Sequence, residues 1–436
     1  MSLFTIITII IAIVLFAIIR RASLDFTSNR MLKIFAIYWF VSVLLASVGV
    51  FDIFEIHTLT YMVVLLGVIF FCFGFIAGGK NRSPIFAIEK DEVSAQFESL
   101  ASNIIYRIIL IIASIYVSSL LVIFFEKIMF YQSLASVRTD FYAAELYGPL
   151  YSQLNAFFLR PLYLVTLPVF AYLILYKRNW ICFLSGYYLV GYESLSGGRI
   201  GYIRIALGVL FIAYCLLRTF KNNKRRGISL LVISGLAIFA LLVIVSAARM
   251  GSVGLDKESR QVGLETTTEH IVSYTACPIA ALDHSITHNY SSLIGGYQYG
   301  KLTLTPVITF INLFTSRIGF SLSVPLNDLV EYKQSIPIDI APELDWNALY
   351  TANLYFYNDF GVLGVIIFPF LFGLLISRLI SQMYKYRSIP LIMIVSFCFW
   401  CMVDSVLDYA FVSAYDFMTL LIMYFLGTRK SYIYKR

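Results

Sequence analysis

The chain has 436 residues, of which 60% are hydrophobic and only 13% are charged. Soluble domains average roughly 45–50% apolar and 25% charged residues, so this composition excludes a string of soluble domains and indicates a polytopic membrane protein. The formal net charge of +8 would suggest a nucleic-acid partner in a soluble chain. In a membrane protein it reflects instead which side of the bilayer the basic residues face.

A helix that crosses the hydrocarbon core needs about 20 mostly apolar residues. The runs are continuously apolar, which excludes the alternating pattern of a β-barrel wall. The sequence therefore predicts one all-α membrane domain over residues 1–436. Its eleven expected spans are 3–19, 34–51, 58–77, 104–124, 157–176, 179–196, 200–217, 228–247, 352–376, 389–407 and 410–427.

Basic residues near span ends predict the orientation, because Lys and Arg are kept on the cytoplasmic side. The first run has no cleavage site and is followed by Arg20 and Arg21, so we expect a retained helix whose N-terminus lies outside. The C-terminus is then cytoplasmic, and 248–351 forms a large outer subdomain between spans 8 and 9. Within it, 302–314 is short and interrupted by Pro306, which predicts a re-entrant or interfacial helix.

Several arginines lie on the expected outer side, against the positive-inside rule. The planar guanidinium binds phosphate oxygens in a bidentate manner, so these positions suggest an anionic ligand at the membrane surface. The alternative is that they pair with acids such as Glu193. The arginines concerned are Arg138, Arg160, Arg199, Arg204, Arg249, Arg260 and Arg317.

Two short signatures lie at expected outer ends of spans. The first, 194–202, reads Ser-Leu-Ser-Gly-Gly-Arg-Ile-Gly-Tyr. Its small residues allow a ligand to approach the backbone, and its arginine starts the next helix, where an anion is favoured; a plain tight hairpin is the alternative. The second, 350–364, is rich in aromatic side chains and carries Asp359. These aromatics could equally form the interfacial belt.

Other patterns in the sequence give weaker indications of function. The histidines lack zinc-ligand spacing, and the glycine-rich segment 295–300 lacks the Lys-Ser/Thr of a phosphate loop. The sequence therefore predicts no metal site and no cofactor. Asp404 and Asp408 are four residues apart and are expected on one helical face as counter-charges.

The Ser-Gly-Gly-Arg turn at 196–199, the late outer loop and the Tyr-Asn-Asp-Phe-Gly-Val-Leu-Gly stretch at 357–364 resemble the O-antigen polymerase family (Wzy-type, oligosaccharide repeat unit polymerases). The resemblance implies a multi-pass, GT-C-like, metal-independent glycosyltransferase of the bacterial inner membrane. It would transfer a growing polysaccharide from undecaprenyl diphosphate onto a lipid-linked repeat unit. A flippase and a chain-length regulator (Wzz-type) are the implied partners.

Within that chemistry, Arg199 and Arg249 are expected to hold the diphosphate, with Arg204 and Arg317 as secondary candidates. The general base is left open among Asp359, His270, Glu269 and His284, and the candidates for stacking on sugars are Tyr297, Tyr299 and Trp346. Three rivals remain. An O-antigen ligase would pass the polymer to a lipid A core acceptor, a polysaccharide flippase or transporter would move it, and a scaffold would leave the outer arginines unexplained.

Overall fold

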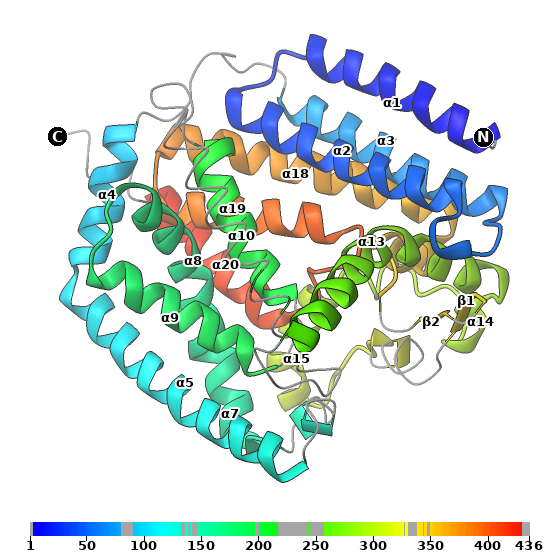
Figure 1. Cartoon of the computed structure of the whole chain (residues 1–436). Helices are drawn as coiled ribbons and strands as arrows, with labels where there is room; N and C mark the ends of the chain where they lie inside the picture. Colours follow the sequence, from blue (N-terminus) through cyan, green and yellow to red (C-terminus); the bar gives the residue numbers. More distant parts are fainter. Residues whose placement is uncertain are drawn as a thin grey trace. The chain divides into compact units, whose positions relative to one another are not determined.

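The described part of the chain is mostly helical and contains one short β-hairpin (Figure 1). It divides into two compact units, which we describe separately: unit 1 comprises 1–86, 271–386 and 398–429, and unit 2 comprises 87–270, 387–397 and 430–436. The computed structural model describes residues 3–79, 90–131, 136–137, 140–141, 146–196, 200–216, 240, 243, 257–326, 328–329, 338–342, 344–346 and 349–429.

Unit 1 contains the first three long helices and most of the C-terminal half of the chain. Its elements are α1 (Leu3–Arg21), α2 (Phe26–Val48), η1 (Val50–Asp52), α3 (Thr58–Gly79), the end of α13 (Lys257–Thr287), α14 (Tyr290–Leu293), α15 (Thr305–Thr315), η4 (Ser316–Ile318), β1 (Ile338–Ala341), β2 (Leu344–Trp346), α17 (Asn353–Phe360), α18 (Val362–Tyr386), the end of α19 (Ile389–Asp404) and α20 (Ala414–Arg429).

Helices α3 and α18 lie side by side (Figure 1) and make the most extensive helix contact within unit 1. A Cβ added to Gly74 of α3 would meet the backbone of Phe370, and one added to Gly373 of α18 would meet the backbone of Phe71. Gly74 and Gly78 are four residues apart on α3. Small residues at this spacing let two membrane helices approach closely, so the absent side chains allow this contact.

Unit 2 contains a second group of packed helices. Asn179 caps α9, since its side-chain oxygen accepts from the N–H of Cys182 at 3.0 Å. The elements are α4 (Lys90–Ser102), α5 (Ile104–Tyr131), α7 (Gly148–Leu154), the π-helical turn η2 (Asn155–Leu159), α8 (Arg160–Tyr176), α9 (Trp180–Ser194), α10 (Ile200–Leu210), the π-helical turn η3 (Phe211–Leu216) and the first parts of α13 and α19.

Six helical segments of the described chain are long and apolar enough to cross a membrane. These helices confirm the expectation of an all-α polytopic membrane protein. The expected span 228–247 falls almost entirely outside the described residues, and the other expected spans coincide with helices. The six are Phe4–Arg21, Phe26–Val48, Thr58–Gly79, Ile104–Tyr131, Gly148–Tyr176 and Val362–Tyr386.

The expected ninth span, 352–376, is two helices. Gly361 has φ 61° and ψ −142°, a conformation that favours glycine, and it separates α17 from α18. The expected outer subdomain holds α13, α14, α15 and the β-hairpin, whose register pairs Ile338 with Trp346. Residues 305–314 of the stretch 302–314 are helical as part of α15, and 302–304 form the turn before it.

Candidate functional site

Two segments that the sequence singled out separately lie against each other in unit 1. The N–H groups of Gln298 and Tyr299 donate to the carbonyls of Asn358 and Asp359, both at 3.0 Å. The glycine-rich segment is therefore fastened to the C-terminal end of α17. Segment 295–300 therefore forms part of the molecular surface beside the start of α18.

The carboxylate of Asp359 holds the same loop from the other side. One oxygen accepts from the N–H of Leu302 at 3.1 Å and the other from the N–H of Thr303 at 2.8 Å. Asp359 is fully buried and both its oxygens are engaged, so the geometry favours a structural role for this general-base candidate.

Three aromatic side chains beside this junction are exposed, and we refer to them as the aromatic shelf. Tyr297 is 44%, Tyr299 74% and Phe360 39% exposed. The rings of Tyr299 and Phe360 meet edge to face with centroids 5.8 Å apart. Exposed aromatic faces on a rigid backbone suit a ligand that is apolar on one side and hydroxylated on the other, such as a sugar ring.

Trp346, the third sugar-stacking candidate, lies inside unit 1. It is only 8% exposed, and its Nε1–H donates to the carbonyl of Leu349 at 2.7 Å. Its ring packs edge to face on Tyr274 with centroids 5.8 Å apart. Because its polar atom is satisfied internally, Trp346 serves packing, and the structure does not bring it onto the aromatic shelf.

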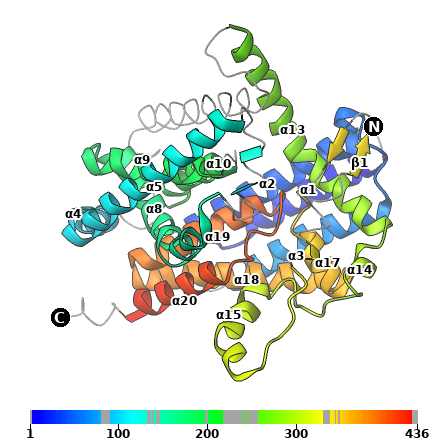
Figure 2. The same cartoon turned by 90° about the horizontal axis from the view of Figure 1, so that it is seen from below.

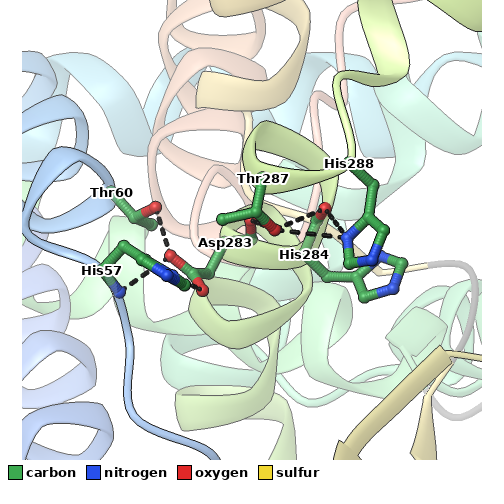
Figure 3. Close-up of polar contacts among 6 residues, drawn as sticks. All are labelled: His57, Thr60, Asp283, His284, Thr287 and His288. Carbon is green, nitrogen blue, oxygen red and sulfur yellow. Dashed lines mark hydrogen bonds and ion pairs between the residues drawn. The ribbon is translucent and has the colours of Figure 1, made fainter.

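His284 lies near the end of α13, where Figure 3 shows its ring beside that of His288. The two rings stack with centroids 3.8 Å apart, and the Tyr290 hydroxyl is 3.3 Å from Nδ1 of His284. Burial, and then the nearby charge of His288, lower the pKa of His284 below its ordinary value of 6.5. The imidazole is consequently neutral at pH 7 and able to accept a proton.

In unit 2, charged side chains gather around the described ends of the Ser194–Tyr202 turn. Glu193 is buried and packs against Gly201. The guanidinium carbon of Arg160 lies 5.8 Å from the centre of the Tyr163 ring. Arg204 is half-buried on α10, and its pairing with an acid stays a prediction.

The structure describes only some of the remaining site candidates. Arg199 and Arg249 are outside the described residues. Glu269 is exposed on α13, and His270 follows it in the same helix. Arg317 is exposed on η4.

The two aspartates expected on one helical face do not share a helix. Helix α19 ends at Asp404, and Asp408 follows beyond a turn in which its N–H donates to the Asp404 carbonyl at 2.9 Å. The expectation of a common helical face was therefore wrong. Within the described part of the chain, no group of three or more His, Cys, Asp or Glu side chains is arranged to hold a metal ion.

No family model matches the chain, and no curated protein or solved structure is significantly similar to it. The likeness to O-antigen polymerases thus rests on the short motifs alone.

Proposed function

We propose that this protein is a polymerase of surface polysaccharide that joins undecaprenyl-diphosphate-linked repeat units at the periplasmic face of the bacterial inner membrane. In this proposal eleven spans cross the bilayer, and α18 forms the ninth of them. The N-terminus is periplasmic and the C-terminus is cytoplasmic. The segment 248–351 then lies on the periplasmic side. A flippase supplies the repeat units, and a chain-length regulator of the Wzz type acts with the polymerase.

The aromatic shelf is the observation that carries the proposal. Tyr297, Tyr299 and Phe360 are exposed directly beside the start of α18, the span Val362–Tyr386. A lipid-linked sugar presents its first residues at this level, because its diphosphate stays with the headgroups. An aromatic surface fixed by backbone hydrogen bonds supports the binding of such sugars without the cost of ordering a loop.

The reaction needs only binding and proton transfer. The acceptor hydroxyl oxygen attacks the anomeric carbon of the polymer, the bond from that carbon to the diphosphate oxygen breaks, and undecaprenyl diphosphate leaves. Arg199 and Arg249 stabilise the charge that develops on the diphosphate, and Arg204 and Arg317 are secondary candidates. Of the general-base candidates, His284 is the best supported, because its lowered pKa keeps the ring ready to take the hydroxyl proton.

The test is polymerisation by the full-length protein reconstituted with a lipid-diphosphate-linked oligosaccharide. Arg199→Ala, Arg249→Ala and Tyr299→Ala should each shorten or abolish the ladder of products. Arg178→Ala serves as the matched control, because Arg178 is an exposed arginine that follows α8. Undiminished ladders from both Arg199→Ala and Arg249→Ala at normal protein levels would refute the assignment of the diphosphate site.

The same reconstitution separates the rival functions. A polymerase lengthens the oligosaccharide, whereas a ligase leaves it unchanged until a lipid A core acceptor is added. A flippase or transporter changes the side on which the oligosaccharide is found and does not elongate it.

A further inference from the structure

The segment from Leu302 to Leu326 carries a single charged side chain, Arg317. It forms α15, η4 and the turn that follows at Gly319. Its apolar side chains are exposed where the chain reverses. We refer to this reversal as the α15 tip, with Phe314 at 63%, Ile318 at 80% and Phe320 at 55% exposed.

The α15 tip makes several internal hydrogen bonds although it is not one continuous helix. The side-chain amide of Asn312 accepts from the N–H of Leu322 at 2.9 Å and donates to the carbonyl of Leu322 at 2.8 Å. The N–H of Phe320 donates to the carbonyl of Thr315 at 3.1 Å. Backbone that enters hydrocarbon must be satisfied internally in this way, because no water is present there.

The tip is anchored to an apolar helix of the same unit. Helix α15 packs along α20, where the rings of Phe310 and Phe417 meet edge to face with centroids 5.6 Å apart. Figure 2 shows α15 projecting from the flank of α18 and α20, across the direction in which α3 and α18 run. Since α3 and α18 are candidate membrane spans, a helix that leaves their flank sideways extends along the bilayer plane.

We propose that the α15 tip inserts among the lipid acyl chains around the protein. Phe314, Ile318 and Phe320 contact the hydrocarbon, and Arg317 extends its guanidinium to the headgroup phosphates while its aliphatic stem stays with the apolar side chains. The stretch is as poor in charge as the lipid-facing surface of a span. The occupant that fits this surface is therefore lipid.

The test is a depth measurement on the full-length protein in lipid nanodiscs. Nitroxide labels are placed on Phe314→Cys, Ile318→Cys and Phe320→Cys, and their collisions with oxygen and with a water-soluble nickel chelate are measured by electron paramagnetic resonance. Leu371→Cys, 49% exposed on α18, is the lipid reference, and Ser292→Cys, exposed on α14, is the water reference. Labelled wild type supplies the background, because four native cysteines are buried and two are half-buried.

The proposal expects the three tip positions to resemble Leu371→Cys, with oxygen collisions enriched several-fold over nickel collisions relative to Ser292→Cys. Tip labels that match Ser292→Cys would place the tip in water and overturn the proposal. Labels shielded from both reagents would show that a second copy or another protein covers the tip, and would overturn it as well. Labelling at three exposed positions keeps the test decisive if one variant fails to fold. None of these outcomes depends on polymerase activity.

Discussion

Asp283 and His57 are joined by two hydrogen bonds although 226 residues separate them in sequence. One carboxylate oxygen of Asp283 accepts from the backbone N–H of His57 at 3.0 Å, and the other lies 3.0 Å from Nδ1 of the ring. The hydroxyl of Thr60 donates to the first oxygen at 2.6 Å, as Figure 3 shows. An acid on α13 thus holds the residue that precedes α3 and a side chain of the first turn of that helix within unit 1.

Replacing Asp283 by Ala should destabilise unit 1 under all conditions. The N–H of His57 and the hydroxyl of Thr60 would lose their acceptor, and a hydrogen bond contributes about 0.5–1.5 kcal/mol. The free energy of unfolding in detergent, followed by circular dichroism, measures the loss. Glu126→Ala is the control, because Glu126 is an exposed acid on α5. Equal stability of the Asp283→Ala and Glu126→Ala variants would show that these hydrogen bonds contribute nothing.

The ring of His57 should add a pH-dependent part to this contact. Its hydrogen bond to Asp283, followed by the charge of Asp283 and that of Glu55, raises the pKa of His57 above 6.5. A raised folded-state pKa means that the contribution is fully present below pH 6.5 and is lost as the pH rises through the folded-state value. His57 is largely exposed, so solvent and salt weaken the effect.

Thermal unfolding of wild type and His57→Gln between pH 5.5 and 9 checks this sign. The difference in melting temperature should be largest at the acidic end, shrink toward pH 9 and decrease in high salt. A difference that grows with pH would contradict the assignment. Asp283→Ala measured in parallel should lose stability at every pH, because two of its three hydrogen bonds do not involve the ring.

The contact between α3 and α18 gives a prediction about membrane-helix packing. Gly74→Leu would force a side chain into the backbone of Phe370, which cannot move without shifting α18. Overpacking costs about 1–3 kcal/mol and occasionally more. Ala77→Leu makes a similar change at an exposed position of the same helix and should be nearly neutral. Similar losses of unfolding free energy in both variants would indicate that the small residue at Gly74 is not needed for this packing.

The sequence predicted best what depends on local chemistry. Long apolar runs located the helices, because the bilayer dictates their length and composition. Most of the interrupted stretch 302–314 was correctly predicted to be helical, since α15 covers 305–314 of it. The four-residue spacing of Asp404 and Asp408 gave a wrong prediction of a shared helical face. Residues i and i+4 share a face only where the helix continues, and α19 ends at Asp404.

Contacts between distant segments could not be predicted. Much of α13 is polar, so it gave no apolar run to mark a 31-residue helix, and nothing in the sequence links Asp283 to His57. The role of segment 295–300 depends on carbonyls of residues 358 and 359. From the sequence, Trp346 resembles a residue that stacks on sugars. In the structure the β-hairpin that contains it leaves its side chain buried.

Asp359 should prove essential for stability whether or not it takes part in catalysis. Asp359→Ala leaves the buried N–H groups of Leu302 and Thr303 without acceptors, which costs about 1–3 kcal/mol for each group. Unfolding free energy measures this, with the exposed Asp339→Ala as the control. A stable, well-folded Asp359→Ala protein that makes no polymer would instead assign Asp359 to the reaction.

The histidine pair at the end of α13 gives a test of the general base that relies on a pH profile. If neutral His284 takes the proton of the acceptor hydroxyl, His284→Gln should slow polymerisation by about 10²–10⁴-fold. This is the rate enhancement that general-base catalysis typically contributes. In wild type the rate should fall only below pH 6.5, because burial and then His288 lower the pKa of His284. His288→Gln removes the second of these influences.

The His288→Gln variant should therefore stay active while its acidic limb moves toward higher pH, since less repulsion lets His284 protonate more readily. A structural role for the stacked rings predicts a different outcome, in which both variants lose folded protein and neither shifts the profile. The measurement is the initial rate of ladder formation from pH 5 to 8.5, normalised to folded protein. An acidic limb that stays at the same pH in His288→Gln excludes His284 as the titrating base, because its stacking partner would then have no influence on the proton that limits the reaction.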